Sequence, residues 1–173
     1  VIFDELYQRP DLKLNFKFTD DLDVEWIGHP NWFYRISKYI MPYLVNKYVP
    51  ETYFLHELKE IPADLENYVL KPLFSFAGAG VIIDVTREDI DQIQDKSNYI
   101  LQRKVTYEPV LKSPNDPVKV EIRILMLWPK EAEKPFIVNN LVRLSKGKMI
   151  GVKYNKDKDW VGGSVGFFEE TNE

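Results

Sequence analysis

Basic side chains in separate parts of the chain have the types and spacing that could neutralise a polyphosphate. They are Lys38, Lys71, Arg123 and Arg143. A lysine supplies a compact positive charge, and an arginine can bind two phosphate oxygens at once. Lys71 is followed by a loop of small residues within the stretch YVLKPLFSFAGAGVIIDVT, residues 68–86. Glycines in such a loop allow backbone N–H groups to approach an anion closely, so the stretch predicts a phosphate site.

A simpler explanation of the same residues stays open. A lysine at the end of a strand is usually solvated, and arginines on strands often lie on a polar face. The order lysine, loop, strand and helix is what favours the phosphate site. The stretch lacks the G-x-x-x-x-G-K-[ST] pattern of a P-loop. Its loop precedes an expected strand, whereas the loop of a dinucleotide-binding fingerprint precedes a helix.

The hydrophobic patterns predict the elements that would position these residues. Strands are expected at Val69 to Lys71, at Val81 to Val85 and over YILQRKV, and a helix should begin after Thr86 with Asp89 completing a capping box. A short strand is expected over ETYFL and another over residues 12–18.

Other elements are expected before and after this group. A helix should begin after Asn31, with a kink or a short second helix at Pro42, and HELKEIPADLEN should form a helix or turn. In the last third, VKVEIRILMLW predicts a long half-buried strand after a proline-containing loop. FIVNNLVRLSKGKMIGVKYN predicts two strands joined at Lys146 and Gly147, with Gly162 and Gly163 in a final loop.

The composition limits the classes of function. Of 173 residues, 45% are hydrophobic and 14% aromatic, which suffices for a packed core, and no apolar run approaches the ~18 residues of a membrane span. The net charge of −4 argues against nucleic acid as a partner. The chain has no cysteine and its histidines are His29 and His56, which argues against thiol chemistry and a multi-histidine metal site. We therefore expect a cytoplasmic protein without a membrane or nucleic-acid partner.

Residues 32–168 resemble an ATP-grasp domain. The resemblance rests on the KP pair and glycine-containing loop of VLKPLFSFAGAGV, on the hinge-like strand YILQRKV, on the upstream segment YRISKYIMPYLVNKYVPETY, and on NNLVRLSKGKMIGVKYNKDKDWVGG. It implies an α+β fold in which two α+β subdomains with antiparallel sheets clasp a nucleotide cleft. It further implies residues 1–66 as an arm and helical segment, 67–108 as the smaller subdomain and 109–173 as the larger one. Because the chain starts without Met and little precedes Trp32, we expect a fragment whose other domains are missing.

The resemblance also implies a role for individual residues in binding ATP and Mg²⁺. Lys71 and Arg143 would act in catalysis, and Lys38 and Arg123 would also contact phosphate. The remaining ATP contacts would come from the loop, the hinge and the ribose site, namely Ser75, Gly78, Ala79, Gly80, Gln102, Arg103, Lys104, Val105 and Glu108. Asn155 would hold magnesium.

Two positions depart from the family pattern. Ser145 and Lys153 stand where the family usually has acidic metal ligands. Magnesium prefers hard carboxylate oxygens, and a lysine repels it. Glu121 would then be the second magnesium ligand, with Asp157 and Asp159 as alternatives.

The function implied by the resemblance is that of a carboxylate–amine or carboxylate–thiol ligase. ATP would phosphorylate a carboxylate, and an amine or thiol would attack the acyl phosphate; the two substrates are not specified by the sequence. Two alternatives stay open. The domain could bind nucleotide or serve as a scaffold after losing catalysis, or the chain could be an unrelated α+β binding module.

Overall fold

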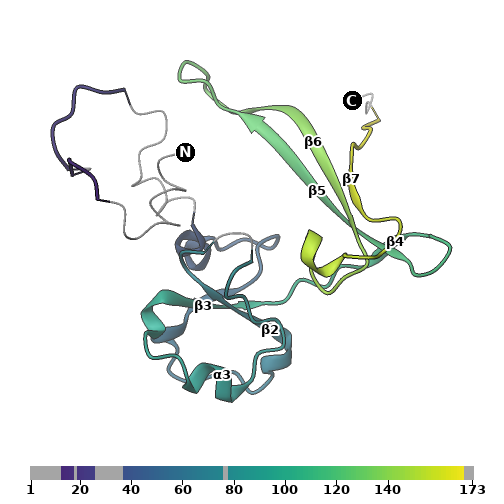
Figure 1. Ribbon diagram of the computed structural model, residues 1–173, viewed down its shortest axis with the longest axis horizontal. Coiled ribbons are helices and arrows are strands. Elements are labelled where there is room, and N and C mark those ends of the chain that lie inside the picture. The colour runs from purple at the N-terminus through teal and green to yellow at the C-terminus, as the bar shows by residue number, and fades with distance from the viewer. Residues whose placement is uncertain (1–12, 18, 26–36, 76–77, 170–173) are drawn as a thin grey trace. The chain divides into compact units, whose positions relative to one another are not determined.

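The computed structural model describes residues 13–17, 19–25, 37–75 and 78–169 (Figure 1). The chain divides into two compact units, Val1–Val105 and Thr106–Glu173, here called unit 1 and unit 2. Within the described residues, each unit contains one antiparallel sheet, of three strands in unit 1 and four in unit 2. The expected α+β class with antiparallel sheets is therefore confirmed.

The sheet of unit 1 has the order β1-β3-β2. Its strands are β1 (Thr52–Phe54), β2 (Tyr68–Pro72) and β3 (Tyr99–Arg103). The described helices of this unit are short: η1 (Lys38–Tyr43), η2 (Leu55–Glu57), η3 (Leu65–Asn67), α3 (Arg87–Asp91) and η4 (Lys96–Asn98). The central strand β3 pairs with both neighbours, so residues of all three strands share each face of the sheet.

One face of this sheet packs against α3, as Figure 1 shows. Leu70 and Leu101 are opposite each other in the register, and both are fully buried against Ile90 of α3. Thr86 caps α3 and Asp89 returns the hydrogen bond, so the predicted capping box is confirmed. This face is the main hydrophobic core of unit 1.

The opposite face carries a smaller core and the candidate site. Ile100 and Phe54 are buried there together with Leu73, and Met41 of η1 packs against them. Side chains alternate along a strand, so Lys71 and Gln102 share this face with Ile100. The register of the sheet thus places polar groups beside an apolar cluster.

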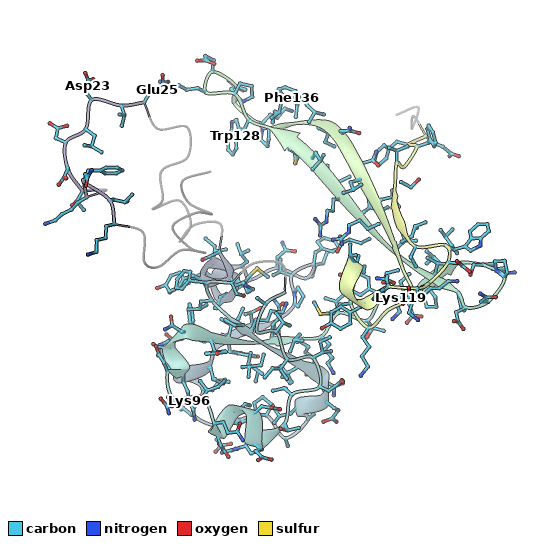
Figure 2. All side chains as sticks on the ribbon, in the orientation of Figure 1. Asp23, Glu25, Lys96, Lys119, Trp128 and Phe136 are labelled. Atoms are coloured by element: carbon cyan, nitrogen blue, oxygen red, sulfur yellow. The ribbon has the colours of Figure 1, made fainter. Side chains whose placement is uncertain are left out.

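Unit 2 is built on a long hairpin of β5 (Val118–Leu127) and β6 (Phe136–Ser145). The edge strands are β4 (Pro109–Leu111) and β7 (Gly162–Ser164), and η5 (Val152–Tyr154) lies between β6 and β7. Trp128 and Phe136 lie at the end of the hairpin where a turn joins β5 to β6, here called its free end, and Lys119 lies near its other end (Figure 2). Most side chains toward the free end are exposed, whereas Val118 and Ser145 are fully buried.

Several predicted elements of unit 1 differ from the structure. Val81 to Val85 form only an isolated bridge at Ile82, because the chain then leaves the sheet to bury Val85 and to cap α3. No strand forms over residues 13–17; the rest of the predicted strand, 12 and 18, lies outside the described residues. Asn31, the predicted helix cap, lies outside the described residues. Within them, Ser37 caps the 3₁₀ helix η1. The interruption predicted at Pro42 is wrong, since Pro42 lies inside η1.

Three predicted elements of unit 2 differ from the structure. The second strand predicted after Gly147 is wrong, since residues 146–151 form a loop that leads into η5. Gly162 and Gly163, predicted as loop, belong to β7 and pair with β6. Pro109 begins β4 within a predicted loop, and a proline is tolerated there because the strand lies at the edge of the sheet.

Candidate functional site

Two lysines of unit 1 lie near the end of β2, close enough that the charge of Lys38 lowers the pKa of Lys71. Lys71 belongs to β2, and Lys38 is the first residue of η1. The ammonium group of Lys38 donates to the backbone oxygen of Ser75 at 2.9 Å and to its hydroxyl at 2.8 Å. The structure therefore brings together three of the predicted ATP contacts from η1, β2 and the segment that follows β2.

Lys71 is held by a neutral side chain. Its ammonium group donates to Oε1 of Gln102 at 2.5 Å. Nε2 of Gln102 donates to Oγ1 of Thr52 at 2.7 Å, and Oγ1 of Thr52 donates to the backbone oxygen of Pro50 at 2.9 Å. Gln102 and Thr52 are buried, whereas Lys71 is partly exposed. The chain of bonds thus links a partly exposed cation to the interior.

The electrostatics of the two lysines favour binding of an anion. Burial lowers the pKa of Lys71, and the positive charge of Lys38 lowers it further. Burial also lowers the pKa of Lys38. Within the described ranges, no carboxylate forms an ion pair with either ammonium group. An anion between the two would offset both their repulsion and their lost hydration.

The small-residue loop returns beside Pro72. Gly78 and Gly80 have φ angles of +78° and +69°, a region that favours glycine. A Cβ atom on Gly80 would lie 2.7 Å from Cγ of Pro72, so the close approach requires glycine at this position. Gly78, Ala79 and Gly80 are exposed, and residues 76–77 lie outside the described part of the chain.

The predicted hinge residues after Gln102 have other partners. Arg103 donates to Asp64 and to the hydroxyl of Tyr68, on the face of the sheet opposite to Lys71. Lys104 donates to the backbone oxygen of Glu66 at 2.6 Å and lies 3.5 Å from Asp84. Val105 is exposed. Only Gln102 of the four hinge residues contacts a lysine of the pair.

A cavity lies beside η1 and β1 in the same unit. Its volume is about 850 Å³, and its walls are mainly apolar with Glu51 and Glu57 among the polar lining residues. Thr52 lines this cavity and also bonds to Gln102, whereas Lys38 and Lys71 do not line it. Thr52 is thus shared by the lysine-binding network and the cavity.

Three of the predicted residues of unit 2 interact with one another. Glu121 and Arg143 are opposite each other on β5 and β6, with Oε1 of Glu121 3.6 Å from a guanidinium nitrogen of Arg143. Arg123 donates to the same oxygen at 2.6 Å. Burial raises the pKa of Tyr107, and the charge of Glu121 adds to the increase while Arg123 and Arg143 oppose it. Glu108 is exposed in the segment before β4.

Asn155 holds the loop between β6 and η5. Its Oδ1 accepts hydrogen bonds from the backbone N–H groups of Lys146 and Gly147 and lies 3.0 Å from Oγ of Ser145. Its Nδ2 donates to the backbone oxygens of Met149 and Gly151. Both ends of the amide are therefore occupied, and a metal could reach Oδ1 only after some of these bonds break.

The described residues contain no cluster of three or more His, Asp or Glu side chains that could hold a metal ion. Glu121 is already paired with two arginines, and Asp157 and Asp159 are exposed. The magnesium roles of Glu121 and Asn155 stay predictions. A cavity of about 280 Å³ in unit 2 is lined by both Arg143 and Asn155, and Gly162 and Gly163 form another part of its wall.

Two polar residues with structural importance were missed from the sequence. Thr52 was placed only on a short strand, although its hydroxyl fixes Gln102. Asn140 is buried in β6 and exchanges two hydrogen bonds with the backbone of Gly166. A polar residue within an apolar strand pattern was the available signal, but the partners are distant in sequence.

Comparison with known proteins gives no relative. No protein-family model, no curated protein and no solved structure matches this chain. In addition, no helix within the described ranges is long and apolar enough to cross a membrane.

Proposed function

We propose that this chain is an ATP-grasp-like domain that binds ATP with Mg²⁺ and belongs to an ATP-dependent carboxylate–amine or carboxylate–thiol ligase. The lysine pair of unit 1 carries the proposal. Lys38 and Lys71 are partly buried, and burial lowers the pKa of both. The charge of Lys38 lowers the pKa of Lys71 further, and among the described residues the two ammonium groups bond to neutral oxygens. A polyphosphate supplies the negative charge that such a site lacks.

The proposed reaction uses the lysines to bind and neutralise phosphate. A substrate carboxylate attacks the γ-phosphate of ATP to give an acyl phosphate and ADP, and an amine or thiol then displaces phosphate from the acyl carbon. Lys38 and Lys71 would orient the phosphates and offset charge on the transferring group. Magnesium supplies further charge neutralisation when it is bound with ATP.

A second candidate is a nucleotide-binding domain without catalysis. It is favoured by the side chains predicted to hold magnesium. Glu121 is engaged by Arg123 and Arg143, and Asn155 uses both ends of its amide within its own loop. Such a domain would bind ATP through the lysine pair without transferring its phosphate.

The first experiment measures thermal stability with and without Mg·ATP. Ligand at one hundred times its Kd should stabilise the protein by about 2.7 kcal/mol. Lys71→Met keeps the apolar part of the side chain and should abolish this stabilisation, whereas Lys59→Met, at an exposed lysine of the same unit, should retain it. An equal ATP effect in wild type and Lys71→Met would reject Lys71 as a ligand.

The second experiment distinguishes the two candidates. A ligase should release ADP from Mg·ATP when pooled amino acids and other carboxylates and amines are supplied, and Arg143→Met should stop the release. Binding of ATP without ADP release under any of these conditions would support the noncatalytic domain instead.

A further inference from the structure

The hydrogen bonds behind Lys71 have a fixed direction. A backbone carbonyl only accepts, so the hydroxyl of Thr52 must donate its single proton to the oxygen of Pro50. The lone pairs of that hydroxyl then accept from Gln102, which assigns Nε2 to the Thr52 side and Oε1 to the Lys71 side. The orientation of the amide thus follows from a backbone oxygen and does not depend on Lys71 itself.

Burial makes it costly to reverse the amide of Gln102. Gln102 is only 5% exposed and Thr52 only 9%, so neither side chain can easily replace a lost partner with water. A reversed amide would place its NH₂ group against the ammonium group of Lys71 and would leave the hydroxyl of Thr52 facing an acceptor. Both changes are unfavourable in a buried site.

We propose that Thr52 and Gln102 are positioning residues that hold Lys71 in place for an anionic ligand while leaving its charge uncompensated. This inference rests on the proposed function, because the anion is taken to be the phosphate chain of ATP. A glutamate at position 102 could hold the ammonium group as well as glutamine does. It would also neutralise the charge, so the neutral amide is what combines a fixed position with a free positive charge.

Two substitutions separate position from charge. Gln102→Glu retains the side-chain shape and adds a negative charge next to Lys71. Thr52→Val retains the shape of threonine and removes the hydroxyl that orients the amide, while Thr52→Ser restores a hydroxyl. Gln94→Glu makes the same change of net charge at an exposed position of unit 1 and is the matched control for Gln102→Glu.

The first readout is the titration of Lys71, followed by NMR of ¹³C-labelled lysine and assigned with Lys71→Met. Gln102→Glu should raise the Lys71 pKa by about one unit or more, because a carboxylate stabilises the charged form. Thr52→Val should lower this pKa, because the ammonium group loses a fixed acceptor, and Thr52→Ser should return it toward the wild-type value. An unchanged Lys71 titration in both Gln102→Glu and Thr52→Val would overturn the proposal.

The second readout is the Kd for Mg·ATP, measured by calorimetry on the same proteins. Gln102→Glu should weaken binding by about tenfold, equivalent to the effect of one pKa unit. Thr52→Val should weaken it severalfold, and Thr52→Ser and Gln94→Glu should bind as the wild type does. Wild-type affinity in both Gln102→Glu and Thr52→Val would overturn the proposal even if Lys71→Met abolishes binding.

The outcomes distinguish this inference from the proposed function. If the wild-type protein binds no ATP, the proposed function fails, and the Lys71 titration still decides whether Thr52 and Gln102 position the ammonium group. If Gln102→Glu does not fold, the Thr52→Val and Thr52→Ser pair decides the same question, since both remain neutral. Melting temperatures measured without ligand show which variants are folded.

Discussion

At the scale of residues, the lysine pair combines partial burial with like charge. Lys38 bonds to Ser75, and Lys71 bonds to Gln102, so both ammonium groups have acceptors but no negative partner among the described residues. A solvated lysine at a strand end, the simpler explanation, would keep its ordinary hydration. The contact with Gln102 and the lowered pKa of Lys71 instead indicate a group held in place at some energetic cost.

The lowered pKa of Lys71 predicts the pH dependence of the proposed ATP binding. Binding of the phosphate chain favours the protonated lysine, so protons should be taken up as the pH approaches the lowered pKa, and the affinity should fall as the pH rises through it. Calorimetry in buffers of different ionisation enthalpy measures this uptake. Proton uptake in Lys71→Met equal to that of the wild type would contradict the prediction.

The same shift should influence the free energy of unfolding without ligand. The unfolded chain binds a proton at Lys71 more tightly, near the ordinary pKa of 10.5, than the folded protein does. Between the lowered pKa and 10.5 the unfolded state therefore binds more protons, and this group makes the protein more stable as the pH rises. Urea unfolding of the wild type and Lys71→Met over this pH range measures whether Lys71 makes the protein more stable as the pH rises.

At the scale of elements, long alternating segments and local caps could be predicted, whereas the loops could not. The strand over Val118–Leu127 and the capping box of α3 depend on neighbouring residues, and both are confirmed. The predicted half-burial of this strand is wrong, because its residues from Ile122 onward are exposed on both faces. The segment after Gly147 resembled a strand by its composition. Its structure depends instead on Asn155, which satisfies several backbone groups of the loop at once.

Substitution by alanine should have different effects at two glycines of this loop. A Cβ atom on Gly147 would lie 2.3 Å from the backbone oxygen of Tyr154, whereas a Cβ atom on Gly151 would meet nothing within 4 Å. Gly147→Ala should therefore lower the free energy of unfolding by about 1–3 kcal/mol, as overpacking usually does. Gly151→Ala should change it little. Chemical denaturation of the two variants measures the difference in the free energy of unfolding. Equal values would show that the loop can move to accommodate a Cβ atom at position 147 without loss of stability.

At the scale of the whole molecule, most of the buried hydrophobic residues that the structure describes belong to unit 1. Its clusters contain Leu70, Ile100 and Leu101, all completely buried, whereas Leu127 near the free end of the unit 2 hairpin is 55% exposed. The two units are thus stabilised differently: unit 1 by packing on both faces of its sheet, and unit 2 largely by strand pairing and side-chain bonds to the backbone.

Leucine substitutions test this distribution. Leu101→Ala should lower the free energy of unfolding by about 2–5 kcal/mol, because it leaves a cavity in the core. Leu127→Ala also truncates a leucine in a strand, and should cost no more than about 0.5 kcal/mol, as exposed substitutions usually do. Thermal and urea unfolding measure the stability of both variants against the wild type. A large loss in Leu127→Ala would show that this end of the hairpin is covered in solution.

The sequence by itself determined the strands that carry Lys71 and Gln102 and the cap of α3, because each depends on periodicity or on residues a few positions apart. The α+β class was implied by the resemblance of these segments to a known family. Only the tertiary structure decided that Lys38 meets Ser75, and that Gln102 joins Lys71 to Thr52, because these residues are 31 to 50 positions apart. Their meeting depends on strand register and on the packing of η1. Local pattern does not encode either of these, since both arise from contacts between distant segments.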